Sequence, residues 1–129
     1  MIRIFILFLF LIFSCNSLNP PELNIISHSE LVEIQETEYI LIDVRTIQEY
    51  ESGFIKQAIN IDFYSESFKN DILSVEKDSK VILYCRTNNR SNKTAKILLE
   101  NGYMDVNVID GGITSWVKNG NDINYSIID

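Results

Sequence analysis

Apolar runs and segments of helical periodicity alternate along the chain from about residue 25 onward. Continuous apolar runs of strand length are typical of strands that are buried on both faces of a sheet. Such runs predict strands at Tyr39–Val44, Ala58–Ile61, Lys80–Cys85 and Val106–Asp110. Apolar residues at helical spacing, with helix start and stop signals, predict helices at Ser27–Gln35, Thr46–Gly53, Ser65–Leu73, Ser91–Gly102 and Gly111–Gly120.

Two of these helices begin with the same short signature. Glu30 follows Ser27 by three residues, and Glu49 follows Thr46 at the same spacing. This spacing predicts a capping box, in which the hydroxyl and the carboxylate accept hydrogen bonds from main-chain N–H groups of the first turn. Gly102 fits the end of the long helix that precedes it.

Strands and helices in this alternation predict an α/β domain of three layers, with a mostly parallel central sheet flanked by helices. Ligands of such sheets bind beyond the carboxyl ends of the strands. Polar or reactive groups follow three of the predicted strands, namely Asp43 with Arg45, Cys85 with Arg90, and Asp110. We expect these groups to meet at one edge of the sheet.

The length of 129 residues fits one domain, and the composition is that of an ordinary globular protein. The formal net charge of −7 argues against nucleic-acid binding. His28 is the single histidine, so we expect no metal site, and we expect no cofactor. Two arginines close to a cysteine stand out against this acidic background.

The N-terminal residues differ from the rest of the chain. Arg3 precedes an apolar run, Ile4–Phe13, that is shorter than the roughly 20 residues needed to span a bilayer and fits the core of a secretory signal. The sequence IFSC, which ends at Cys15, resembles the lipobox of bacterial lipoproteins, whose cysteine is lipidated. We predict a signal peptide at 1–14, a lipidated tether at 15–24 and a domain at 25–129.

This interpretation predicts an exported protein that its lipid anchors to a bacterial membrane, facing the periplasm. Lipidation would remove Cys15 from disulfide formation and leave Cys85 as the free thiol. The alternatives are a plain signal peptide that is cut nearby and an uncleaved short anchor.

Cys85 ends a predicted buried strand and is followed by a polar segment. The segment reads Arg86, Thr87, Asn88, Asn89, Arg90 and Ser91. A short loop that enters a helix can turn successive main-chain N–H groups toward one point and so bind an anion. We expect this environment to hold the sulfur as a nucleophilic thiolate. The alternative is a small buried side chain without chemistry, which is the usual state of a cysteine at a strand end.

Four segments, in the same order, resemble the rhodanese-domain sulfurtransferases. YCRTNNRS resembles their active-site loop, LIDVRTIQEYESGFI their Asp-Val-Arg segment, AINI the next strand, and ENGYMDVNVIDGGITSWVKNG their closing glycine and tryptophan pattern. The resemblance covers about residues 24–120. Phe54 stands where the family commonly has a histidine, and Gln57 or Asn88 stands where it has a glycine. Because asparagine tolerates left-handed backbone, we expect the loop around Asn88 to close.

The resemblance implies that Cys85 takes the sulfane sulfur of a small anion such as thiosulfate and passes it to cyanide or a thiol. A thiol on a partner protein is an acceptor of the same chemistry. Residues 86–91 would then form the substrate-binding loop, with Arg86 and Arg90 steering the anion and Ser91 capping the helix.

Two side chains after the first long strand are candidates for supporting this loop. We expect Arg45 to form a scaffold ion pair with Glu49. Asp43 either lies near the cysteine loop or simply caps a turn.

The loop length separates this function from its nearest competitor. The resemblance extends to cysteine-based phosphatases, including those of rhodanese fold, which have five residues between cysteine and arginine, whereas four lie between Cys85 and Arg90. The smaller loop suits a single sulfur atom better than a phosphate. A persulfide carrier, a redox sensor and a binding module of the same fold stay open, and turnover would distinguish an enzyme from a carrier.

Overall fold

The computed structural model describes residues 21–34 and 36–126. Its elements in chain order are β1 (Asn24–Ile26), α1 (His28–Glu33), β2 (Ile40–Asp43), α2 (Ile47–Glu51), β3 (Ile59–Asn60), α3 (Phe68–Leu73), β4 (Val81–Tyr84), α4 (Asn89–Glu100), β5 (Val106–Ile109) and α5 (Gly112–Lys118). The predicted signal peptide, Cys15 and most of the predicted tether lie outside the described residues. Within the described part, no helix has the length and apolar character to cross a membrane.

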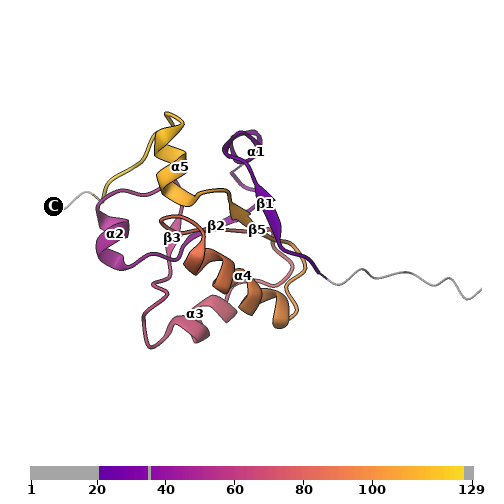
Figure 1. Ribbon diagram of the computed structural model, residues 1–129. Coiled ribbons are helices and arrows are strands. Elements are labelled where there is room, and N and C mark those ends of the chain that lie inside the picture. The colour runs from indigo at the N-terminus through magenta and orange to yellow at the C-terminus, as the bar shows by residue number, and fades with distance from the viewer. Residues whose placement is uncertain (1–20, 35, 127–129) are drawn as a thin grey trace, which may run out of the picture.

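The strands form one sheet in the order β1-β5-β4-β2-β3, and all neighbouring strands are parallel. β4 therefore lies in the middle, between β5 and β2, and the carboxyl ends of these three strands are adjacent (Figure 1). The apolar pattern did not predict β1, because a strand of three residues is too short to show a periodicity.

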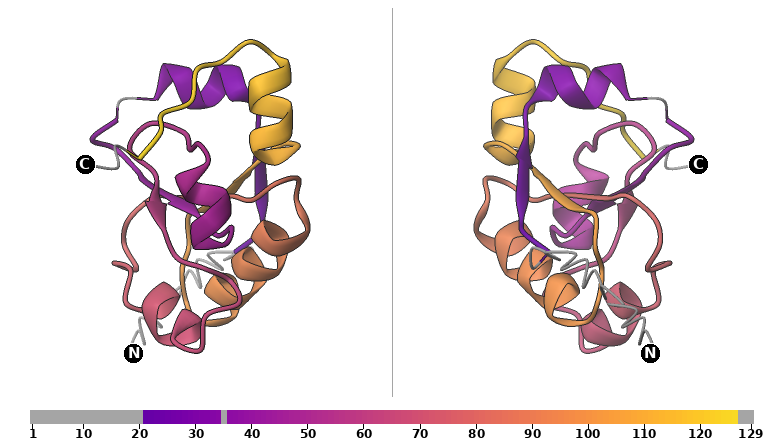
Figure 2. Two further views of the ribbon diagram at one scale, coloured as in Figure 1. Left: turned by 90° about the vertical axis from the view of Figure 1, so that its left-hand side faces the viewer. Right: turned by 90° about the vertical axis from the view of Figure 1, so that its right-hand side faces the viewer.

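Helices cover both faces of the sheet, with α3 and α4 on one side and α1 and α5 on the other (Figures 1 and 2). Successive side chains of β4 point to opposite faces of the sheet and so contribute to both apolar clusters. Val81 and Leu83 belong to the apolar cluster beneath α3 and α4, whereas Ile82 and Tyr84 belong to the cluster beneath α1 and α5. These two clusters confirm the predicted three-layer α/β architecture.

The predicted helix starts are confirmed at both capping boxes. The Ser27 hydroxyl accepts a hydrogen bond from the Glu30 N–H at 3.2 Å, and the Thr46 hydroxyl accepts one from the Glu49 N–H at 3.2 Å. The predicted start of the long helix at Ser91 is wrong, because α4 already begins at Asn89. Asn88, the residue before the helix, makes no side-chain cap hydrogen bond, because its side chain bonds instead to the main chain of Ile109 and Gly111.

Candidate active site

Cys85 lies directly after β4, in the middle of the carboxyl edge of the sheet. The pleat turns its side chain toward α4, and its sulfur lies 3.4 Å from the hydroxyl of Ser91 in the first turn of that helix. The residue is only 1 % exposed, so the rest of the sulfur contacts the core. The sulfur therefore faces the helix start, as an anion-binding loop requires, and its low exposure admits only small reagents or reagents that displace the loop.

The main chain of the cysteine loop is held from one side. The carbonyl of Cys85 accepts a hydrogen bond from the Ile113 N–H at 3.0 Å, and the carbonyl of Arg86 accepts one from the Thr114 N–H at 3.1 Å. With these carbonyls directed at α5, the main-chain N–H groups of residues 86–91 have no acceptor among the described residues. Successive free N–H groups that turn toward one point can bind an anion. The loop thus has the donors that the sequence predicted.

Asn88 fastens the same loop to the turn between β5 and α5. Its side-chain amide donates to the carbonyl of Ile109 at 3.0 Å, and its side-chain oxygen accepts from the N–H of Gly111 at 2.9 Å. The expected left-handed conformation is wrong, because Asn88 has φ −139°. Apart from glycines, the described residue with left-handed backbone is Gln57, with φ 69°. Asn88 therefore stabilises the loop through the hydrogen bonds of its side chain, and its backbone is not left-handed.

Ser91 does not cap α4, contrary to the prediction, because it lies inside the first turn. It is fully buried, and its hydroxyl donates to the carbonyl of Asn88 at 3.2 Å while it lies beside the sulfur of Cys85. A buried hydroxyl can rotate its proton between two acceptors. Ser91 can therefore donate to the sulfur when the sulfur is ionised. The other loop residues Arg86, Thr87 and Asn89 are exposed.

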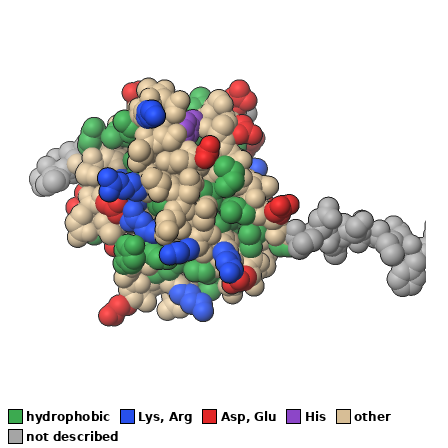
Figure 3. All heavy atoms as spheres, viewed as in Figure 1, with side chains coloured by type: hydrophobic (Ala, Val, Ile, Leu, Met, Phe, Trp, Pro, Cys, Tyr) green, Lys and Arg blue, Asp and Glu red, His purple; other side chains and the backbone are tan. Residues whose placement is uncertain are grey.

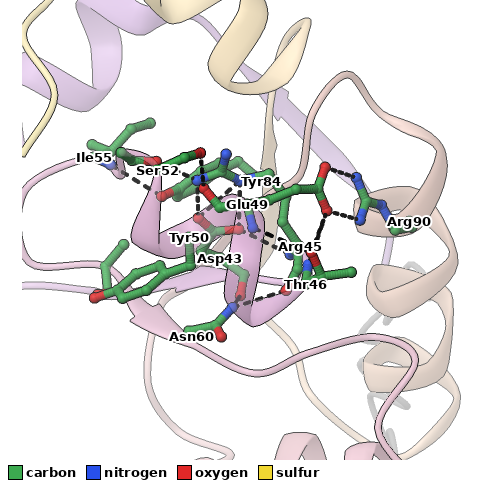
Figure 4. Close-up of polar contacts among 12 residues, drawn as sticks. Asp43, Arg45, Thr46, Glu49, Tyr50, Ser52, Ile55, Asn60, Tyr84 and Arg90 are labelled. Carbon is green, nitrogen blue, oxygen red and sulfur yellow. Dashed lines mark hydrogen bonds and ion pairs between the residues drawn. The ribbon is translucent and has the colours of Figure 1, made fainter. Parts of the chain in front are cut away.

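Arg90 forms an ion pair with Glu49 of α2, and this replaces the predicted pair between Arg45 and Glu49. The two guanidinium nitrogens donate to the two carboxylate oxygens at 2.6 and 2.9 Å (Figure 4). Hydrogen bonds from Arg90 are the main reason why the pKa of Glu49 falls to about 2, and the same bonds raise the pKa of Arg90. Arg90 is thus neutralised, which leaves Arg86 as the loop arginine with a free charge.

Arg45 pairs with Asp43 instead, in a fully buried position. The guanidinium donates to the carboxylate at 2.6 Å and to the carbonyl of Gly53 at 2.6 Å, and the main-chain N–H of Arg45 donates to Asp43 at 2.9 Å (Figure 4). Burial lowers the pKa of Arg45, but the bonds to Asp43 outweigh it, so the pKa is raised overall. The carboxylate of Asp43 thus accepts from the main chain two residues further on, as the turn-capping interpretation describes. The pair fixes the start of α2, and α2 in turn carries the carboxylate that holds Arg90.

The pair between Glu49 and Arg90 should make stability depend on pH. A carboxylate with a depressed pKa stabilises the fold above its unfolded-state pKa, and this contribution is lost as the pH falls from about 4.5 to about 2. We expect urea unfolding to show a loss of about 1–2 kcal/mol over this range that Glu49→Gln does not show. Glu51→Gln, an exposed neighbour on α2, is the control and should behave as the unmodified chain. Identical pH profiles for both variants would contradict the assignment.

The other polar features lie away from this loop. His28 contacts the carbonyl of Asp110 at 3.1 Å and meets the edge of Trp116, which is a packing role. Among residues 21–34 and 36–126, no group of three histidine, cysteine or acidic side chains is arranged to hold a metal ion. A surface hollow of about 540 Å³ lies between α1 and the end of α5 and does not include Cys85. These features are therefore separate from the cysteine loop.

Comparisons with known proteins agree with this geometry. The family model of the rhodanese-like domain matches residues 27–119. A sulfurtransferase of Allochromatium vinosum is 31 % identical over 81 residues, which is 63 % of this chain and 74 % of that protein. A tRNA uridine(34) hydroxylase of Hamiltonella defensa is 32 % identical over 91 residues, or 66 % of this chain, but the match spans only 25 % of that protein.

A solved structure supports the same relationship. The rhodanese-related protein of Thermoplasma volcanium superposes with a TM-score of 0.71 at 27 % identity, over 80 % of this chain and 99 % of that one. The match of the family model covers most of the described residues, including the cysteine loop. The chain therefore belongs to the rhodanese-like domain family.

Proposed function

We propose that this chain is a sulfurtransferase that carries a sulfane sulfur on Cys85. The observation that supports this most directly is the position of the sulfur, 3.4 Å from the Ser91 hydroxyl and at the base of a loop whose six N–H groups have no acceptor among the described residues. The relative from Allochromatium vinosum is named a sulfurtransferase, which agrees with this chemistry.

The reaction needs no oxidant and no cofactor. The thiolate of Cys85 attacks the outer sulfur of thiosulfate, the sulfur–sulfur bond of the donor breaks, and sulfite leaves with its electron pair. The resulting persulfide is an anion. The free N–H groups of residues 86–91 would bind this negative charge, and the Ser91 hydroxyl would donate to the inner sulfur.

The second half of the cycle restores the enzyme. A cyanide ion or a thiolate attacks the outer sulfur of the persulfide, and the electron pair of the broken bond returns to Cys85. Arg86 is the exposed charge available to steer an incoming anion, because Arg90 is bound to Glu49. Arg90 would act by placing the start of α4 and not by binding the donor.

The test uses the full chain in a non-ionic detergent. Intact mass should show the gain of one sulfur atom after thiosulfate and its loss after cyanide. Cys85→Ser should abolish the gain, whereas Cys15→Ser, which removes the other of the two cysteines, should retain it. Turnover with excess cyanide distinguishes an enzyme from a carrier that loads one sulfur and stops. Hydrolysis of a phosphate ester without any sulfur loading would refute the proposal.

We also propose that the protein is exported and lipidated at Cys15, as the N-terminal sequence predicts. Support comes from the short apolar run and the IFSC sequence. Intact mass of the protein from its native membrane would show the loss of residues 1–14 and the added lipid. An unmodified N-terminus would refute this localisation.

A further inference from the structure

The segment that carries the cysteine loop has an unusual charge. Between Asp78 and Glu100 the chain has no acidic residue, although acidic residues number 18 against 11 basic ones in the whole sequence. Five of the basic residues fall in this interval, namely Lys80, Arg86, Arg90, Lys93 and Lys96. A local cationic region in a chain of net charge −7 calls for a physical reason.

Three of these side chains are exposed, and together we call them the basic strip. Arg86 lies in the loop after Cys85, and Lys93 and Lys96 lie on the exposed side of α4. Figure 3 shows lysine and arginine side chains gathered across the face that α4 and its preceding loop occupy. The rise of an α-helix places Lys96 about 10 Å from the first residue of α4, so the strip extends for about two helical turns from the cysteine loop.

Intramolecular pairs leave most of this charge free. Lys96 approaches Glu100 at 3.9 Å, but both side chains are largely exposed, so that pair is weak. By contrast, Arg90, which is not part of the strip, is neutralised by Glu49. Within the described residues, Arg86 and Lys93 form no ion pair. The strip is therefore an exposed cationic surface that the described residues leave largely unpaired.

We propose that the basic strip docks an acidic protein surface next to a cysteine, and that this cysteine accepts the sulfur from Cys85; the inference rests on the sulfurtransferase function. In the transfer, the partner thiolate attacks the outer sulfur, a new sulfur–sulfur bond forms on the partner, and the pair from the broken bond returns to Cys85. The outer sulfur lies about 2 Å beyond the inner one, which brings it closer to the loop surface than the buried thiol.

The size of the strip favours a protein over a nucleic acid. Nucleic-acid affinity depends on neutralising many phosphates along an extended backbone, and the strip offers three exposed cations. The net charge of −7 over the whole chain would repel a long polyanion. A compact acidic patch matches a short cationic row in both charge and extent.

The test measures sulfur transfer from the loaded full chain, in non-ionic detergent, to three short peptides that each hold one cysteine. Four glutamates, four lysines or four glycines flank the cysteine. Each rate of sulfur transfer is divided by the rate at which the thiol of the same peptide attacks a small neutral disulfide. This correction removes the effect of the flanking charges on the thiol itself. We expect the acidic peptide to react about tenfold faster than the neutral one at low salt, and the advantage to vanish at high salt.

The decisive variant is Lys93→Glu with Lys96→Glu. It should lose the preference for the acidic peptide while its rate with the neutral peptide stays unchanged. Lys77→Glu with Lys80→Glu makes the same change of charge before β4, at the opposite edge of the sheet from Cys85, and should keep the preference. Equal rates for the three peptides, or equal behaviour of the two double variants, would overturn the inference.

A binding measurement separates this inference from the proposed function. A labelled acidic peptide with serine in place of cysteine should bind the Cys85→Ser chain and lose affinity with Lys93→Glu and Lys96→Glu. Such binding without any sulfur loading would refute the sulfurtransferase function and with it the acceptor role, whereas loading without binding or peptide preference would refute the docking surface alone. Tighter binding of a single-stranded RNA through the same lysines would overturn the choice of partner.

Discussion

Replacing Gly112 by alanine should disable the cysteine loop. A Cβ atom at this position would lie 2.4 Å from the carbonyl oxygens of Cys85 and Thr87 and 2.8 Å from that of Arg86. These are main-chain atoms, so the loop itself must move. The residue also has φ +59°, which disfavours any side chain. We expect a loss of about 3 kcal/mol or more in the free energy of unfolding, and a fall of at least about 100-fold in the rate of sulfur loading.

Gly120→Ala is the matched control for this experiment. Gly120 also has a positive φ, +80°, but a Cβ there would meet no atom within 4 Å. The control should lower the free energy of unfolding by only about 1–2 kcal/mol, which is the strain of a left-handed alanine. It should leave sulfur loading unchanged. Urea unfolding and intact mass measure both quantities. Equal losses for the two variants would show that the close contact between Gly112 and the loop has no special role.

Replacing Asp43 by asparagine should produce the second large effect. The change keeps the shape of the side chain but removes the negative charge that compensates the buried guanidinium of Arg45. Leaving one member of a buried ion pair without its partner costs about 3–5 kcal/mol. We expect a loss of this size in urea unfolding, together with slower sulfur loading, because the start of α2 and hence Glu49 would lose their support.

The control for this variant is Asp78→Asn, which removes the same charge at an exposed position. It should change the free energy of unfolding by less than about 0.5 kcal/mol. A second variant, Asp43→Leu combined with Arg45→Met, tests the charge directly. If the uncompensated charge causes the loss, the double apolar variant should be more stable than Asp43→Asn. A loss below about 1 kcal/mol for Asp43→Asn would contradict the role of the pair.

Helices, strands and the cysteine loop could be predicted from the sequence where the interactions that form them join residues close together in the chain. The capping boxes at Ser27 and Thr46 involve residues three apart, so their helix starts could be predicted from spacing alone. The central strands could be predicted because burial on both faces demands continuous apolar runs. Cys85 and its loop could be identified because the strand, the cysteine and the polar segment are consecutive in the chain.

The ion pairs could not be predicted in the same way. Arg45 was expected to pair with Glu49, which lies four residues away, but it pairs with Asp43, and Glu49 pairs with Arg90 across 41 positions of sequence. Charge alone does not select among several acidic partners. The choice depends on which strand edge buries which side chain, and the parallel order of β2 and β4 decides it.

The sequence by itself determined the alternation of strands and helices and placed Cys85 with its polar loop at the carboxyl edge of the sheet, where we propose that its sulfur is the nucleophile. These properties follow from periodicity, capping and chain continuity, which are encoded over a few residues. Only the tertiary structure decided that Gly112 and Asn88 brace the loop, that Ser91 faces the sulfur, and that Arg90 is neutralised. Each of these contacts joins segments that become neighbours only when the sheet assembles, because hydrogen bonds and ion pairs act over a few ångströms in space and not along the chain.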